Sequence, residues 1–156
     1  MSRIPVRIEI PQAMRIEHSE LHEALVEATK VEGDVGEAAR EVARVLHPHF
    51  VREEQIVLPP LGLLEDLARG VFTAEMAAVL PLTDALRTEL PRMLAEHGEI
   101  RTALTTLAAT AHEQGLPQYA RLADKIMLHA ATEEQVTYPT ALIVGDYVRM
   151  RLDDAE

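Results

Sequence analysis

The sequence predicts an all-α protein: an up-down-up-down four-helix bundle with a long, partly helical connection between helices 2 and 3 and a short C-terminal helix. Three observations lead to this fold class. The 156 residues are 47% hydrophobic but only 3% aromatic, a balance that suits packed helices better than sheets. Apolar residues recur at spacings of three and four, and the two halves of the chain carry similar segments in the same order. The length fits one domain over residues 1–156, with the bundle core at about 11–140.

The first half of the chain predicts an extended arm followed by two helices. Residues 1–10 alternate apolar and polar side chains, which is typical of an extended segment. Pro11 suits the first turn of a helix that runs to about Lys30. After a glycine-containing turn, a second helix is expected to continue to Pro59, with Pro48 inside it as a source of a kink.

The second half predicts the connection and the remaining helices. Residues 61–90 form the long connection, with helical pieces of their own. The third helix is expected from near Pro91 to Gly115, a residue type that often ends helices. The fourth helix is ended or kinked by Pro139, and residues 140–152 form the last helix. The inward face of the fourth helix is expected to carry Leu122, Ile126, His129, Glu133 and Val136.

Composition and charge exclude several classes of function. The formal net charge of −11 argues against a nucleic-acid partner and against docking on an anionic membrane. The chain has no cysteine, which excludes disulfides, thiolate metal sites and cysteine nucleophiles. No apolar run approaches the roughly 20 residues of a membrane span, and the N-terminus does not resemble a signal peptide. The sequence therefore predicts a cytoplasmic protein.

The candidate functional residues stand in a motif that occurs twice. Each copy has a Glu-His pair on one helix and a His-x3-Glu-Glu segment on the next, with a proline soon after. The first histidines of the two copies are 79 residues apart and the second histidines 80. The two copies are Glu17-His18 with His49-x3-Glu53-Glu54, and Glu96-His97 with His129-x3-Glu133-Glu134.

The residue types and spacing in this motif predict a dinuclear metal site. Residues four apart lie on one face of a helix, so the His and the first Glu of each His-x3-Glu segment can reach one metal ion. Burying several unpaired ionisable groups in a small core costs several kcal/mol each, and metal coordination offsets that cost. The second Glu of each segment points about 100° away and is expected beside the ligands or on the surface. The predicted ligands are His18, His49, Glu53, His97, His129 and Glu133.

The same spacing argues against one rival class of metal-binding bundle. Ferritin-like di-iron proteins use Glu-x-x-His segments. None of the seven histidines in this chain has a glutamate three residues before it. The sequence therefore disfavours an iron-storage bundle of that type.

On these residues the sequence resembles the hemerythrin-like domains of the HHE cation-binding type, over about residues 11–140. The resemblance implies two iron ions joined by an oxo or hydroxo bridge, with an open position for O2 or another small diatomic ligand. It implies that Glu53 and Glu133 bridge the irons, and that one iron binds His18 and His49 while the other binds His97 and His129. The ligand types suit manganese and zinc as well as iron.

Two positions depart from the family pattern. His22 lies four residues after His18 and is a seventh candidate ligand, with a role beside the site or on the surface as the alternative. The equivalent position in the second copy is Arg101, which is expected to pair with a bridging glutamate or a bound anion or to point outward. This departure argues against simple reversible O2 carriage. Tyr119 and Tyr138 are candidates for a nearby hydroxyl, and the sequence does not decide between them.

Three functions follow from these patterns and stay open at this point. The favoured one is a non-haem di-iron protein that binds O2, nitric oxide or peroxide in sensing, storage or a stress response. The alternative is a di-iron redox enzyme that reduces peroxide or nitric oxide or oxidises iron. The third is an interaction module with buried histidines and no metal. The sequence leaves homodimerisation and the identity of any signalling partner open.

Overall fold

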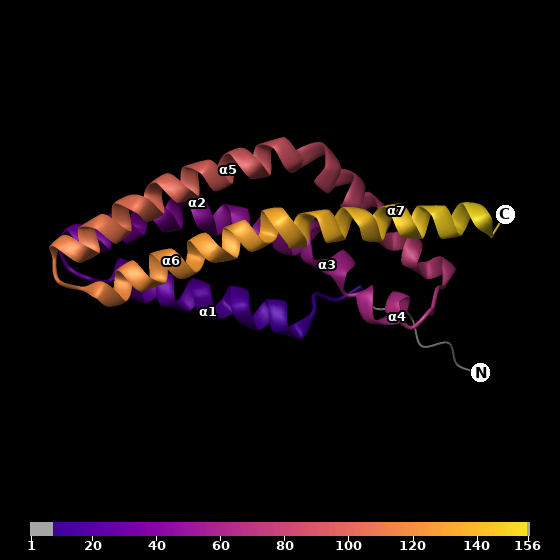
Figure 1. Cartoon of the computed structure of the whole chain (residues 1–156), viewed down its shortest axis with the longest axis horizontal. Coiled ribbons are helices and arrows are strands. Elements are labelled where there is room, and N and C mark those ends of the chain that lie inside the picture. Colours follow the sequence, from indigo (N-terminus) through magenta and orange to yellow (C-terminus); the bar gives the residue numbers. More distant parts are fainter. Residues whose placement is uncertain (1–7, 156) are drawn as a thin grey trace.

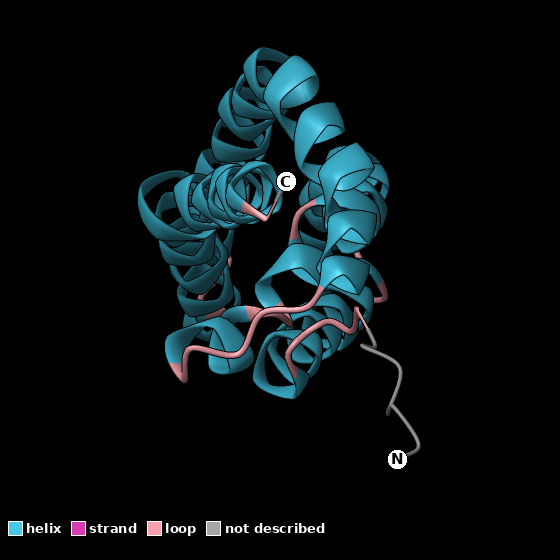
Figure 2. Cartoon of the chain, turned by 90° about the vertical axis from the view of Figure 1, so that its right-hand side faces the viewer, coloured by secondary structure: helices cyan, strands magenta, loops and turns pink. Residues whose placement is uncertain are grey.

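The computed structural model describes residues 8–155, which form helices joined by short connections (Figure 2). No β-strand occurs in this part of the chain. The predicted N-terminal arm lies mostly outside the described residues, and residues 8–10 are irregular. The elements are α1 (Gln12–Thr29), α2 (Asp34–Ile56), α3 (Leu58–Leu61), α4 (Leu64–Ala68), the 3₁₀ helix η1 (Ala74–Val79), α5 (Leu80–Glu113), α6 (Pro117–Thr132), the π-helix η2 (Glu133–Thr137) and α7 (Tyr138–Asp154).

Four long helices form the bundle, which confirms the predicted fold class. Helix α2 packs against α1 and α5, and α6 packs against α5 and α1, so the four helices make a ring (Figure 1). Helices α3, α4 and η1 form the partly helical connection between α2 and α5. Helix α7 continues in line with α6 beyond the ring and packs against α5 (Figure 1).

The third bundle helix is longer than the sequence predicted. Helix α5 begins at Leu80 and passes through Pro91, where the sequence analysis placed its start. A proline inside a helix removes one backbone hydrogen bond and bends the helix, but long flanking turns that pack well can retain it. Helix α5 bends midway along its length (Figure 1). At its other end, Gly115 adopts a φ of +69°, as expected for a residue that follows a helix.

The fourth helix also differs from its prediction. Pro139 does not end it, because Pro139 lies in the first turn of α7, where its missing N–H is tolerated. Between α6 and α7 the backbone widens into the π-helix η2, a feature that is frequent at functional sites. The wider turn rotates the following side chains around the helix axis relative to a regular α-helix. As a result, Val136 is exposed and Thr137 and Tyr138 are buried. The prediction that Val136 faces inward was wrong for this reason.

Apolar clusters lie on both sides of the layer that holds the motif histidines. The larger cluster joins α1, α2, α5 and α6 toward the turns at Gly33 and Gly115, and contains Leu21, Leu25 and Leu104. The second cluster lies toward α3 and α7 and contains Leu58, Leu86 and Tyr138. Within residues 8–155, no helix combines the length and apolar character that a membrane crossing requires.

Candidate metal centre

The six predicted ligands meet in the middle of the four-helix ring. One imidazole comes from each of α1, α2, α5 and α6, and the two carboxylates come from α2 and from the first residue of η2. Five of the six side chains are buried, with Glu53 fully inaccessible, and His129 is partly buried. The helical spacing of four within each His-x3-Glu segment aims both of its side chains at the same interior layer.

The six residues form two overlapping groups of candidate metal ligands. The first group, called here the His18 group, consists of His18, His129, Glu53 and Glu133. The second, the His49 group, consists of His49, His97, Glu53 and Glu133. In each group the ligand atoms lie within 4.8 Å of one another. Both carboxylates belong to both groups, as expected for bridging ligands.

The histidine pairing differs from the one that the family resemblance implied. His18 was expected to share an ion with His49, but it lies beside His129, with the two Nε2 atoms 3.2 Å apart. His97 correspondingly lies beside His49, with ring centroids 4.6 Å apart. The reason is the ring of helices: α1 and α6 bring their histidines together on one side, and α2 and α5 do so on the other.

Each carboxylate directs one oxygen toward each group. Oε1 of Glu53 lies 3.9 Å from Nε2 of His18, and its Oε2 lies 3.5 Å from Nε2 of His49. Oε2 of Glu133 lies 3.4 Å from Nε2 of His129, and its Oε1 lies 3.4 Å from Nε2 of His97. Two atoms at such separations can both lie about 2.0–2.2 Å from an ion placed between them.

Orphaned polar atoms show that the cluster suits a bound cation. Among the described residues, five buried side-chain nitrogen or oxygen atoms have no hydrogen-bond partner, and four of these belong to the six residues. They include Oε1 of Glu53 and Oε2 of Glu133, the oxygens that face the His18 group. Unpaired buried acceptors are costly, and a cation between them removes the cost. Imidazole and carboxylate donors without sulfur suit iron, manganese or zinc.

A second carboxylate lies behind every histidine of the cluster. Nδ1–H of His97 donates to Glu134 over 2.9 Å, and Nδ1–H of His129 donates to Glu17. Nδ1 of His18 lies 3.5 Å from Glu54, and Nδ1 of His49 lies 3.8 Å from Glu96. The hydrogen bonds of His97 and His129 fix the ring and keep the proton on Nδ1, which leaves Nε2 free to bind a metal, whereas the carboxylates behind His18 and His49 lie near without a hydrogen bond. Every Glu of the repeated motif therefore has a place in the site.

Arg101 reaches this outer layer and not the metal-binding atoms. Its guanidinium donates to Glu134 over 2.6 Å, onto the same carboxylate oxygen that accepts from His97. Arg92 lies 3.7 Å from Glu96 on the same side of the site. The expectation that Arg101 pairs with a bridging glutamate was wrong, because its guanidinium meets Glu134 in the outer layer before it can reach Glu53 or Glu133.

The close packing of these groups shifts their pKa values in the metal-free protein. Burial and the neighbouring Glu133 raise the pKa of Glu53 to about 8. Burial also acts on Glu133, but its contacts with Glu53 and with three histidines hold its pKa well below the usual range. Burial lowers the pKa of His129, but Glu133 and Glu17 outweigh this and raise it to about 9. Without metal, the cluster therefore retains protons that a bound cation would displace.

His22 is not brought to the cluster, although the sequence made it a candidate ligand. Its side chain is exposed and lies beside His47, with ring centroids 5.3 Å apart. One turn beyond His18 on α1, the short imidazole of His22 ends at the surface, whereas the longer side chain of its counterpart Arg101 extends to Glu134. The structure therefore supports the surface alternative for His22.

Tyr138 lies at the site. The sequence did not decide whether Tyr119 or Tyr138 would supply a nearby hydroxyl. The Tyr138 hydroxyl donates to Oε2 of Glu53 over 2.6 Å and lies 3.0 Å from Nε2 of His49 and 3.1 Å from Nε2 of His97. Burial, followed by the nearby Glu53 and Glu133, raises the pKa of Tyr138 far above its usual value. The helical period gave no signal for this contact, because the π-helix turns Tyr138 inward. Tyr119 instead packs beside the larger apolar cluster.

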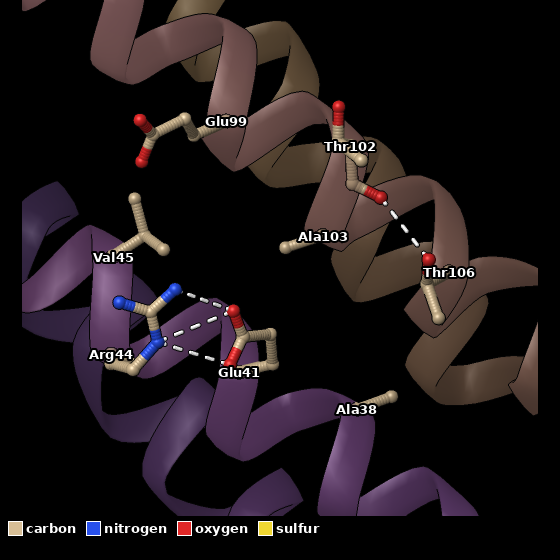
Figure 3. A pocket seen from close by; sticks show the side chains of 8 residues that line it. All are labelled: Ala38, Glu41, Arg44, Val45, Glu99, Thr102, Ala103 and Thr106. Atoms are coloured by element: carbon tan, nitrogen blue, oxygen red, sulfur yellow. Dashed lines mark hydrogen bonds and ion pairs between the residues drawn. The ribbon is translucent and has the colours of Figure 1, made fainter.

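A cavity outside the metal-ligand cluster contains none of the six candidate ligands in its lining. It has a volume of about 480 Å³ between α2 and α5 (Figure 3). Its lining includes Ala38 and Ala103 and the ion pair between Glu41 and Arg44 (Figure 3). With no buried ionisable group in its lining, this cavity offers none of the chemistry of the metal centre.

Comparison with known proteins shows the family of the chain. A family model described as the hemerythrin HHE cation-binding domain matches residues 10–141. This range contains both copies of the motif and both groups of candidate ligands. Neither the comparison with curated proteins nor the comparison with solved structures gives a significant match.

Proposed function

The chain belongs to the hemerythrin HHE cation-binding domain family, and on that premise we propose that it is a non-haem di-iron protein that binds O2 or a related small ligand. Nitric oxide and peroxide are the related ligands, and sensing, storage or a stress response is the role that suits such binding. In this proposal the ligands are His18, His49, Glu53, His97, His129 and Glu133. An oxo or hydroxo bridge completes the pair of irons.

The observation that carries the proposal is the placement of the two carboxylates. Glu53 and Glu133 each present one oxygen to the His18 group and the other to the His49 group. An ion in the His18 group alone would take Oε1 of Glu53 and Oε2 of Glu133, whereas the other oxygen of each carboxylate points to the imidazoles of the His49 group and is placed to bind a second ion there. Two ions, each held by two imidazoles and two carboxylate oxygens, satisfy all of these atoms.

Bound iron supplies a redox-active Lewis acid with coordination positions that the protein does not fill. The protein's own residues determine how that chemistry is presented. The apolar clusters above and below the layer limit the access of water, and the outer carboxylates orient the imidazoles. With four imidazoles and only two inner carboxylates, the ligand set is richer in nitrogen than the ferritin-like arrangement.

Metal analysis of anaerobically purified protein tests the proposal. We expect about two iron ions per chain, and an absorption spectrum that changes when O2 or nitric oxide is added to the reduced protein. The matched variants are His49→Ala, which should lose iron, and His47→Ala, which removes an exposed imidazole two residues away and should not. One ion per chain, no iron, or equal loss in both variants would contradict the proposal.

The redox enzyme is the rival to a binding protein at the same site. Both functions need the same ligands, so the metal content does not separate them. Incubation with peroxide or nitric oxide and an electron donor does: an enzyme consumes its substrate over many turnovers, whereas a binding protein reacts once per site. Recovery of the original spectrum after removal of the gas supports binding, and sustained consumption supports the enzyme.

A further inference from the structure

The two halves of the motif differ at the residue just before the proline that follows each His-x3-Glu-Glu segment. This residue is Leu58 in the first half and Tyr138 in the second, and both are buried. They are 80 residues apart, the same offset that relates His49 to His129. Each stands five residues after a bridging carboxylate, Glu53 or Glu133. The repeat therefore places a leucine at one metal-binding group and a tyrosine at the other.

Tyr138 fills the space at the His49 group. Its hydroxyl oxygen is within 3.1 Å of Nε2 of His49, Nε2 of His97 and Oε2 of Glu53. These are three of the atoms that would bind an ion at this position. A phenol oxygen can bind a metal ion, and a cation at this position would offset the negative field of the two glutamates.

The π-helix explains why Tyr138 can reach this point. In an α-helix, residues five apart differ by about 140° around the axis, so Tyr138 would point away from Glu133. A π-turn closes its hydrogen bond between residues five apart and so places them nearly above one another. Because η2 spans Glu133–Thr137, it brings Tyr138 onto the inner face that Glu133 occupies.

Leu58 leaves space at the His18 group. A cavity of about 60 Å³ lies there, lined by Leu58 together with His18, His129 and Glu133. The rest of its lining comes from Met14, Glu17, Thr132 and Thr137. An ordered water needs on the order of 10–15 Å³ of such space, so the cavity can hold a diatomic molecule or a small anion. Its walls include three members of the His18 group and none of the histidines of the His49 group.

We infer that the two metal positions have different roles: Tyr138 binds the metal of the His49 group through its phenol oxygen, and the external ligand binds at the His18 group in the cavity beside Leu58. This inference rests on the proposed function. When Tyr138 binds metal, its hydrogen bond to Glu53 is replaced by the bond to the ion, and the phenol proton leaves to solvent. The ligand class is a small molecule or anion of two or three atoms.

The first test uses absorption by the ferric protein, prepared by loading iron anaerobically and oxidising it with ferricyanide. A phenolate bound to ferric iron absorbs visible light, because charge moves from oxygen to metal. We expect this band in the wild-type protein and in Tyr119→Phe, and its loss in Tyr138→Phe. Retention of the band in Tyr138→Phe, or its absence from wild-type protein that binds two irons, would overturn the role of Tyr138. Wild-type protein without iron would instead overturn the proposed function.

The second test measures azide binding to the same ferric proteins by optical titration. Leu58→Phe narrows the cavity and is expected to weaken azide binding by about 10-fold or more, because the larger ring occupies space that azide would fill. Thr132→Leu is a second variant that narrows the same cavity. Because Thr132 is exposed, this variant should fold even if Leu58→Phe does not. Both variants should keep two irons and the phenolate band. Tyr138→Phe should still bind azide, and wild-type affinity in both cavity variants would overturn the placement of the ligand.

Discussion

The two groups of candidate metal ligands are built from the same repeated motif but have different surroundings. All four members of the His49 group are buried, and Arg101 and Arg92 contact the carboxylates behind its histidines. In the His18 group, His129 is partly exposed, and the carboxylates behind its histidines, Glu17 and Glu54, are 55% and 46% exposed. The comparison teaches that a duplicated ligand set can give one closed and one open position through changes outside the ligands.

The largest effect is expected from a substitution that removes a carboxylate shared by the two groups. Because Glu53 offers one oxygen to each group, Glu53→Ala should weaken metal binding at both positions, by more than the 10–100-fold that loss of an outer partner costs. Metal analysis after gel filtration should give well under one ion per chain. The neighbouring Glu54→Ala serves as the control and should retain about two. If Glu53→Ala keeps one tightly bound ion, the carboxylate does not bridge.

Graded chelation should separate the two groups. The His18 group has the more exposed ligand and the adjacent cavity, so a chelator is expected to remove its ion first. The second ion should leave more slowly, because all ligands of the His49 group are buried. Complete removal should lower Tm, since metal held only by the folded state adds about 2.7 kcal/mol at 100 times its Kd. Stopped-flow measurement of metal release checks this, and a single phase for both ions would contradict the difference.

The outer carboxylates provide a smaller contrast. Glu134 accepts a hydrogen bond from His97 and a second one from Arg101, whereas Glu54 only lies near His18. Glu134→Gln is therefore expected to lower the affinity for one of the two metal ions by about 10-fold, and Glu54→Gln to lower it by less. Competition titrations with a metal-sensitive dye measure both. Equal losses of affinity in the two variants would show that the outer carboxylates contribute equally to metal binding in the two groups.

The smallest expected effect is a pH dependence of the stability of the metal-free protein, which metal binding opposes. Folding raises the pKa of Glu53 from 4.5 to about 8 and that of His129 from 6.5 to about 9. The folded metal-free protein thus holds protons that the unfolded chain has released, and its free energy of unfolding falls as pH rises from about 4.5 to 9. Metal binding strengthens over the same range, because the ligands must lose those protons.

Thermal unfolding at pH 6 and pH 9 checks this expectation. The Tm of chelated protein should be lower at pH 9, by on the order of a few degrees. The difference in Tm between iron-loaded and chelated protein should widen as the pH rises. A chelated protein that becomes more stable between these pH values would show that Glu53 and His129 do not retain their protons.

Much of the site was predictable, because a helix converts sequence spacing into direction. The six inner residues were found from the repeat and from the spacing of four, and all of them meet in one layer. The limits lay where the helix departs from its regular period. The start of α5 was placed wrongly, since Pro91 was treated as a boundary. Val136 and Tyr138 exchanged faces relative to the regular pattern, since η2 is a π-helix.

The sequence by itself determined the helices, the duplicated motif and the chemical types of the ligands. These follow from local propensity, from periodicity and from the composition, which offers imidazole and carboxylate but no thiol. Only the tertiary structure decided that His18 lies beside His129 and that His22 remains at the surface. A side chain that points to the axis of a four-helix ring lies between two neighbouring helices, and only the packing of the ring determines which of them it meets. The same packing brings the Tyr138 hydroxyl to one group and leaves the cavity beside Leu58 at the other.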